Sequence, residues 1–150
     1  MKPGAALFER ITGHFANGAA VDDFEPATQC FLSVQDNIQR ILNSRCGSLL
    51  HLPDYGLDDL SEIYQDLPAS TLRLQRRMER TLLAYEPRLK KVRIELAQPD
   101  PDIMLSFTMT CHLHQAGLVR FGTHFLPDGK TRLTLLKSEL DRHIESALSL

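Results

Sequence analysis

The spacing of apolar residues in this 150-residue chain changes between Tyr85 and Val92, and this change constrains the fold more than any other feature. Before it, Leu74, Met78 and Leu82 recur every fourth residue, which is the period of a helix with one buried face. After it, every second residue is apolar, as in a half-buried strand. Helices followed by an antiparallel meander predict an α+β domain, with N-terminal helices packed on an antiparallel three- to four-stranded sheet.

Three helices are expected ahead of the sheet. Ser33 and Asp36 have the form of a capping box, which predicts that the first helix begins at Ser33 and ends within residues 43–47. A short helix is expected at residues 59–64. The strongest pattern predicts a third helix at residues 70–86, because a proline follows and the residue before a proline is driven out of the helical region.

The second half of the chain is expected to form strands joined by tight turns. The alternating pattern predicts strands at residues 92–96, 103–113 and 119–125, and a short strand that ends at Leu133. Apolar residues then recur at helical spacing from Leu136, so a terminal helix is expected. The predicted parts are a flexible N-terminal arm (1–28), a folded domain (29–135) and a C-terminal helical extension (136–150).

Composition indicates a cytoplasmic protein. Hydrophobic residues make up 43% of the chain and charged residues 24%, which is the balance of a soluble globular protein. No apolar run approaches the roughly 18 residues that a membrane span needs, so no direct membrane insertion is expected. Residues 1–20 lack the apolar block of a signal peptide.

Net charge and cysteine content limit which partners, disulfides and metal ligands can be expected. The net charge of −2 gives no overall attraction to nucleic acid, so no nucleic-acid partner is expected. The three cysteines, Cys30, Cys46 and Cys111, are an odd number without CxxC spacing. We therefore expect buried free thiols rather than disulfides or zinc ligands.

Three histidines raise the question of a metal site. His112 and His114 lie two residues apart on one strand, so they share a face, and His124 is the third candidate ligand. With a hairpin loop at residues 115–117, His124 lies opposite Thr108, roughly 13 Å from His112 along the ladder. We therefore expect surface histidines and no metal site.

Two groups of charged residues allow either a functional or a structural interpretation. Asp58, Asp59 and Glu62 could serve a glycosidase, but they stand where a short helix is expected to begin, and acids there complement the helix dipole. The basic residues are either a surface for an acidic partner, which includes nucleic acid, or two solvated faces. They are Arg73, Arg77, Arg80, Lys90, Lys91 and Arg93.

Two short motifs are expected to have rigid backbones. Glu86-Pro87-Arg88 lies between the third helix and the first strand. Its acid and base either pair with local groups and fix this corner, or they reach into a partner protein. In the run Pro-Asp-Tyr-Gly at residues 53–56, proline presets φ and glycine permits a positive φ, which predicts a turn.

These motifs resemble the TssE family, baseplate subunits of the type VI secretion system that are related to a small wedge protein of contractile phage tails. The resemblance rests on four segments in this order: Leu7–Ile11, Ile41–Gly47, Leu52–Leu57 and Glu86–Arg88. It runs from about residue 7 to about residue 134, and the terminal segment that begins at Leu136 does not match the family's pattern.

The resemblance implies a structural component of the baseplate wedge, without enzymatic activity or cofactor, that helps to anchor the contractile sheath and initiate its polymerisation. It implies the baseplate subunits TssF, TssG and TssK and the sheath proteins TssB and TssC as partners. A strand edge would then serve as the pairing template for the first sheath ring. The implied partner-binding residues are Glu86, Pro87, Arg88, Pro53, Asp54, Tyr55 and Gly56.

Two other functions are alternatives within the wider superfamily. Phage relatives have been labelled lysozymes, which would make the chain a peptidoglycan hydrolase, but the sequence offers no convincing pair of acid and nucleophile. Another branch is similar to anti-adapter proteins that protect a stress sigma factor, which would make it a binding module. Binding to wedge subunits would separate the baseplate interpretation from both.

Overall fold

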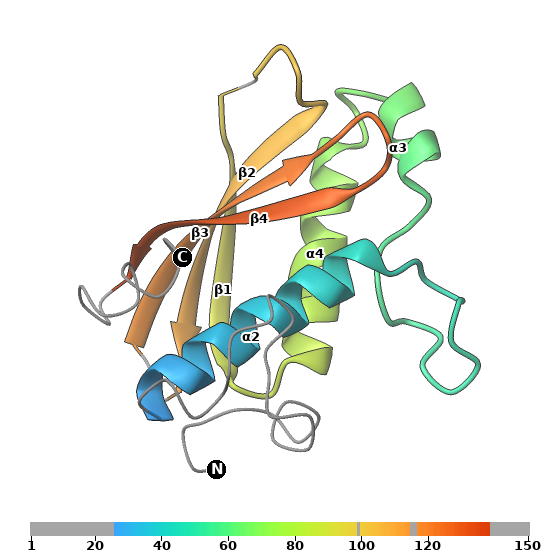
Figure 1. Cartoon of the computed structure of the whole chain (residues 1–150). Coiled ribbons are helices and arrows are strands. Elements are labelled where there is room, and N and C mark those ends of the chain that lie inside the picture. Colours follow the sequence, from blue (N-terminus) through green and yellow to red (C-terminus); the bar gives the residue numbers. More distant parts are fainter. Residues whose placement is uncertain (1–25, 99, 115–116, 139–150) are drawn as a thin grey trace.

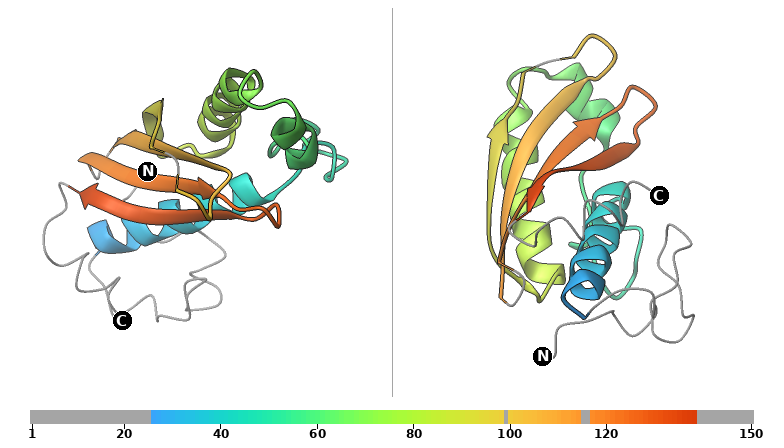
Figure 2. Two further views of the ribbon diagram at one scale, coloured as in Figure 1. Left: turned by 90° about the horizontal axis from the view of Figure 1, so that it is seen from above. Right: turned by 60° about the vertical axis from the view of Figure 1, so that its left-hand side comes forward.

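The structure, a computed structural model, describes residues 26–98, 100–114 and 117–138. The helices are α2 (Pro26–Asn43), α3 (Leu60–Gln65) and α4 (Thr71–Tyr85). The strands are β1 (Leu89–Leu96), β2 (Leu105–Leu113), β3 (Gly117–Phe125) and β4 (Thr131–Ser138). Helices α2 and α4 form a layer against one face of the sheet (Figure 1, and Figure 2 on the right). The predicted α+β class is therefore confirmed.

The four strands form one antiparallel sheet in the order β1-β2-β3-β4, so strands that are neighbours in the sequence also pair. The predicted register of β2 and β3 is wrong by two residues, because His112 lies opposite Leu118 rather than Arg120. The loop is as long as predicted but lies one residue earlier in the chain, since Leu113 pairs with Gly117. A shift of two residues keeps every side chain on its face of the sheet, so the predicted buried face is unchanged.

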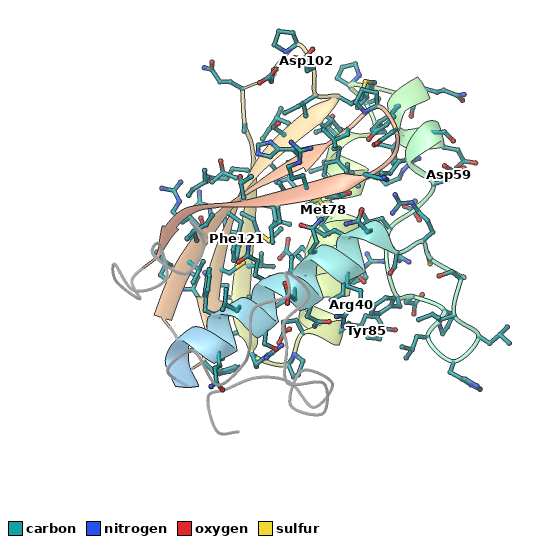
Figure 3. The ribbon with its side chains drawn as sticks, in the orientation of Figure 1. Arg40, Asp59, Met78, Tyr85, Asp102 and Phe121 are labelled. Carbon is teal, nitrogen blue, oxygen red and sulfur yellow. The ribbon has the colours of Figure 1, made fainter. Side chains whose placement is uncertain are left out.

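The core lies between the helices and the inner face of the sheet. Phe31 of α2 stacks on Phe121 of β3, with the ring centroids 5.9 Å apart. Leu74, Met78 and Leu82, the predicted apolar face of α4, are fully buried in the same cluster. Met78 of this face and Phe121 of β3 are labelled in Figure 3. Burial of each large apolar side chain contributes about 1.5–3 kcal/mol, so this cluster fixes α2 and α4 on the sheet.

Helix α2 begins at Pro26, earlier than the predicted start at Ser33. Proline is favoured in the first helical turn, where no backbone donor is needed. Ser33 lies inside the helix and is fully buried, so Ser33 and Asp36 do not form a capping box. The predicted boundary at residue 28 therefore falls within α2, and residues 1–25 of the predicted arm lie outside the described residues.

Strand β4 runs to Ser138, beyond the predicted end at Leu133. Its pairing with β3 continues past a shift in register and reaches the pair Val119–Ser138. Leu136 therefore lies in a strand, and the predicted helical extension does not begin there. The spacing from Leu136 matched a helix, but ladder hydrogen bonds to a neighbouring strand decide the local structure. Residues 139–150 lie outside the described part.

Candidate functional site

The Glu86-Pro87-Arg88 corner lies where α4 ends and β1 begins. The backbone N–H of Glu86 donates to the carbonyl of Leu82, and Pro87 then prevents the helix from continuing. Glu86 is 0% exposed and Arg88 is 8% exposed. Two charged side chains at this depth require partners, because an uncompensated buried charge is strongly destabilising.

Glu86 and Arg88 are paired with each other. Nε of Arg88 donates to Oε1 of Glu86 at 2.8 Å, and Nη2 donates to Oε2 at 3.0 Å, so the guanidinium binds the carboxylate with two parallel hydrogen bonds. The backbone N–H of Arg88 adds a third bond, to Oε1 at 2.9 Å. Of the two alternatives for this corner, the structure shows the pairing with local groups.

The corner also holds helix α2 in place. Nη1 of Arg88 donates to Oγ of Ser33 at 2.6 Å, and Nδ2 of Asn37 donates to Oε2 of Glu86 at 2.7 Å. One buried ion pair thus joins α2, the end of α4 and the start of β1. Pro87 is the exposed member of the motif. The direct contact of Glu86 and Arg88 with a neighbouring subunit stays a prediction.

Burial also determines the state of the cysteines. Cys30 and Cys111 are buried, as predicted, whereas Cys46 is half-buried, and all three are free thiols. Burial, with a smaller contribution from the carboxylate of Glu86, raises the pKa of Cys111 to about 12. This thiol therefore stays protonated at neutral pH and is a poor nucleophile.

The Pro53–Gly56 motif closes a loop between α2 and α3. A short parallel bridge joins the two ends of the loop: the N–H of Cys46 donates to the carbonyl of Leu57 at 2.8 Å, and the N–H of Leu57 donates to the carbonyl of Ser44 at 2.9 Å. Gly56 has a φ of +99°, and a Cβ there would lie 2.5 Å from the carbonyl oxygen of Ser44. Only glycine meets both conditions, as the turn pattern predicts.

Helix α4 braces this loop from the side. Oγ1 of Thr81 accepts a hydrogen bond from the N–H of Gly56 at 3.1 Å and donates one to the carbonyl of Asp54 at 3.4 Å. The ring of Tyr55 packs edge-to-face on Tyr85, with the centroids 5.1 Å apart. Because α4 ends at Tyr85, next to the corner, the same helix supports both predicted motifs.

The tip of the loop carries exposed leucines that the sequence analysis did not identify. Leu50 is 94% exposed, and Leu49 and Leu52 beside it are also exposed. The loop projects from the rest of the molecule between α2 and α3 (Figure 1). Apolar residues that follow neither a helical nor a strand period, between the turn residues Gly47 and Pro53, are the signal that predicts such a tip.

His124 is not the surface histidine that the sequence predicts. Oγ of Ser106 lies 3.0 Å from its Nδ1, and Oγ1 of Thr134 lies 3.2 Å from its Nε2, so the ring is held between neighbouring strands. His112 and His114 are exposed, as predicted. Within residues 26–138, apart from the undescribed positions, no three potential ligands gather as a metal site. None of the described helices combines the length and apolar character that crossing a bilayer requires.

The acidic cluster before α3 has a structural role. Oδ1 of Asp59 accepts hydrogen bonds from the N–H of Ser61 at 3.0 Å and from its Oγ at 2.8 Å, and so caps the helix. These bonds hold the pKa of Asp59 below its ordinary value. Glu62 lies in the first turn, where it complements the helix dipole, as the sequence predicts.

Comparisons with known proteins identify the family. The family model described as baseplate wedge protein gp25 matches residues 31–118, which include both motifs. The chain therefore belongs to the baseplate wedge protein family. A comparison with curated proteins found no match.

A solved structure is also similar to this chain. It is described as "The baseplate complex from the type VI secretion system", and one of its chains is 33% identical to this one, with a TM-score of 0.55. The similarity covers 72% of this chain and 96% of that chain. The predicted resemblance to a baseplate subunit of the type VI secretion system is thus confirmed.

Proposed function

We propose that this chain occupies the TssE position of the type VI secretion baseplate wedge, where it helps to anchor the contractile sheath and initiate its polymerisation. Its partners are TssF, TssG and TssK in the baseplate and TssB and TssC in the sheath. It works in the cytoplasm, as a structural subunit and not as an enzyme. The observation that carries the wedge contact is Leu50, which is 94% exposed on a loop with a fixed base.

The loop tip has the properties of an anchor for a partner protein. Burial of a leucine side chain in a partner's pocket contributes about 1.5–3 kcal/mol. The base of the loop is already held by the bridge between Arg45 and Leu57 and by Thr81 of α4. Because the loop is ordered before binding, less conformational entropy is lost on association.

Replacement of Leu50 by aspartate is expected to release the chain from the wedge without unfolding it. The side chain is almost fully exposed, so the free energy of unfolding should change by less than about 0.5 kcal/mol. A carboxylate in an apolar pocket should lower the amount of captured partner by about tenfold or more. The measurement is co-expression of the tagged chain with TssF and TssG, affinity capture and size-exclusion chromatography.

The matched control is Leu83→Asp, which introduces the same charge on the exposed surface of α4. This variant should capture TssF and TssG as the unaltered chain does. If the Leu50 variant captures as much TssF and TssG as the Leu83 variant and the unaltered chain, the result contradicts the role of the loop tip. Joint loss would mean that any added negative charge weakens the complex.

The outer edge of β4 is partly occupied by side chains of α2. The N–H of Thr131 donates to Oδ1 of Asn43 at 2.9 Å, and the carbonyl of Thr131 accepts from Nδ2 of Asn43 and from Gln39. The N–H of Leu133 donates to Oε1 of Gln39 at 2.9 Å. These amides take the hydrogen bonds that an added strand would need at the start of β4.

The outer edge of β1 is more open. The N–H of Ala97 donates to the carbonyl of Ser106, so the alternation of an antiparallel ladder points the N–H groups of Ile94 and Leu96 away from β2. In the part of the chain that the structure describes, the one side-chain hydrogen bond to this edge comes from Gln75, to the carbonyl of Ile94. This difference supports β1 as the edge that receives a sheath strand.

Replacement of Leu96 by proline should reduce sheath assembly while the domain stays folded. Leu96 is exposed, and proline removes an outward-pointing N–H but no ladder bond to β2. We expect about tenfold fewer sheaths per cell, counted by fluorescence microscopy of labelled TssB, because main-chain hydrogen bonds provide the affinity of strand addition. Leu96→Ala keeps the N–H, so cells with this variant should contain a normal number of sheaths. A folded Leu96→Pro variant with a normal count would exclude this edge.

The hydrolase alternative lacks support in the acidic cluster. A glycosidase needs a carboxyl group with a raised pKa as its general acid. Hydrogen bonds from Ser61 lower the pKa of Asp59 instead, and Glu62 lies in the first turn of α3. Both positions fit a helix start, which supports a structural role. Capture of TssF and TssG would also argue against the anti-adapter alternative.

A further inference from the structure

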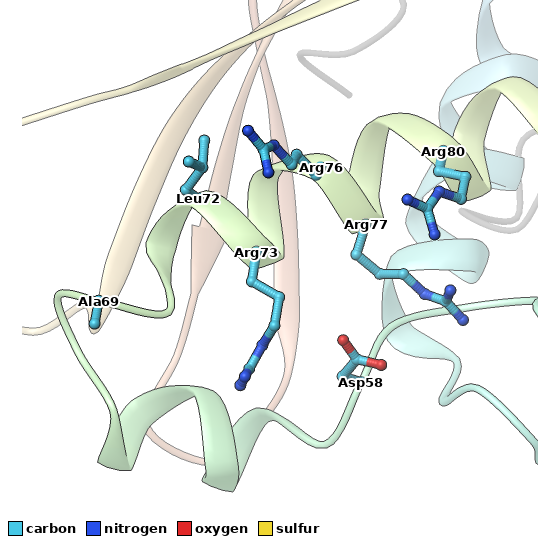
Figure 4. A pocket seen from close by; sticks show the side chains of 7 residues that line it. All are labelled: Asp58, Ala69, Leu72, Arg73, Arg76, Arg77 and Arg80. Carbon is cyan, nitrogen blue, oxygen red and sulfur yellow. The ribbon is translucent and has the colours of Figure 1, made fainter.

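Helix α4 lines a groove that the proposed function does not use. The groove has a volume of about 480 Å³, within the range of pockets that hold a ligand. Four arginines of α4 line it, of which Arg73 and Arg77 extend toward the side of Asp58, whereas Arg76 points to the other side of the helix (Figure 4). The lining residues are Arg73, Arg76, Arg77, Arg80, Asp58, Ala69 and Leu72.

The positive charges in this groove are not balanced by nearby acids. Asp58 is the one acidic residue among the lining side chains, against four arginines. The ion pairs that the structure describes are Glu86–Arg88 and Arg93–Glu95, and neither lies in the groove. Like charges three and four residues apart on a helix repel each other, so an added negative charge would stabilise this surface.

One wall of the groove is held in place before any ligand binds. The guanidinium of Arg77 donates to Sγ of Cys46, and Sγ of Cys46 lies 2.8 Å from the carbonyl of Pro53. Both partners belong to the bridged loop. Nε of Arg77 is buried and has no hydrogen-bond partner among the described residues. The position of this arginine is therefore fixed by the loop and not by a carboxylate of the chain.

We propose that this groove binds an acidic segment of another protein. The planar guanidinium group matches a carboxylate with two hydrogen bonds. The rise of α4 from Arg73 to Arg80 is about 10 Å, and an extended chain advances about 3.3 Å per residue. Acids two and four residues apart lie on one face of such a chain and span about 7 and 13 Å, which brackets this distance. This surface is distinct from the leucine tip, and the inference does not depend on the wedge assignment.

Two other occupants fit the groove less well. Among the described residues no aromatic side chain lines the groove, so it offers no platform for stacked bases. The chain's own acidic run, 22–25, directly precedes α2, whereas Cys46 follows the other end of this helix. An 18-residue helix is about 27 Å long, and four extended residues reach about 14 Å, so this run is too short to reach the groove.

The proposal is tested with the full chain and a fluorescein-labelled octapeptide of alternating glutamate and serine. Anisotropy at low salt should show saturable binding that weakens as salt is added. Arg73→Gln/Arg80→Gln should weaken this binding by about tenfold or more, because two charge-assisted contacts are lost. Arg120→Gln/Arg132→Gln removes the same charge from exposed strand positions and should weaken it by less than about twofold.

Circular dichroism must first show that both double variants are folded. The binding results then decide whether the groove holds an acidic segment. No binding of the glutamate peptide by the unaltered chain would overturn the proposal. Equal weakening in the two variants would show attraction to overall charge rather than to the groove. Tighter, groove-dependent binding of an oligothymidylate would assign the surface to nucleic acid instead. Capture of TssF and TssG is measured separately, so failure here leaves the wedge assignment unaffected.

Discussion

An alanine in place of Arg88 is expected to lower the free energy of unfolding by about 3–5 kcal/mol. The change removes two bonds to the carboxylate of Glu86 and the bond to Ser33, and it leaves a fully buried acid without its cation. Domains of this kind unfold with about 5–15 kcal/mol, so much of the stability is lost. The measurement is urea unfolding at neutral pH followed by circular dichroism, since the chain has no tryptophan.

A second ion pair provides the control for this prediction. Arg93 and Glu95 are 2.9 Å apart, but both side chains are well exposed. Solvent screens such a pair, so Arg93→Ala should cost no more than about 1 kcal/mol. Arg88→Lys should fall between the two, because lysine restores the charge but not the paired geometry. Equal losses for the Arg88 and Arg93 alanine variants would show that the buried pair contributes no more than a surface pair.

Gly56→Ala should lower the free energy of unfolding by at least about 2 kcal/mol, which is about 4–8 °C in Tm. Alanine is strained at a φ of +99°, and its Cβ would lie 2.5 Å from the carbonyl oxygen of Ser44. That oxygen accepts the hydrogen bond from Leu57 that closes the loop. The clash therefore acts on the base that holds Leu50 in position, and thermal unfolding followed by circular dichroism measures it.

Gly47 separates the two causes of this loss. It has a φ of +86°, but no heavy atom lies within 4 Å of the position of an added Cβ. Gly47→Ala should therefore cost only the strain of the left-handed backbone, about 1 kcal/mol. If Gly56→Ala and Gly47→Ala lower Tm equally, the close approach to Ser44 does not contribute to the loss of stability.

Local periodicity determined most of the fold, and the errors arose where distant residues decide. The buried face of α4 and the alternation of β1 and β2 follow from spacing alone. Ser33 was misassigned because a capping pattern is local, whereas its partner Arg88 lies 55 residues away. The helical spacing from Leu136 likewise gave no indication that β3 would extend β4 by pairing.

The candidate site was predictable where proline and glycine restrict the backbone, and less so elsewhere. Both motifs, Glu86–Arg88 and Pro53–Gly56, could be placed at a corner and a turn for this reason. Whether the acid and base of the first motif face inward depends on Asn37, far away in the sequence. The apolar residues between Gly47 and Pro53 follow no regular period, which is the local sign of a loop tip, but the exposure of Leu50 itself depends on how the loop leaves the body of the protein.

The amides of Gln39 and Asn43 also affect how copies of this chain can associate. A sheet with two open edges can pair head to tail with further copies, and such heterologous contacts grow into fibres when they do not close into a ring. Side chains of α2 already bond to Thr131 and Leu133, so the start of β4 offers no template to a second β1. The start of β4 is therefore a poor acceptor for a strand of a second copy, which disfavours head-to-tail association of this chain with itself.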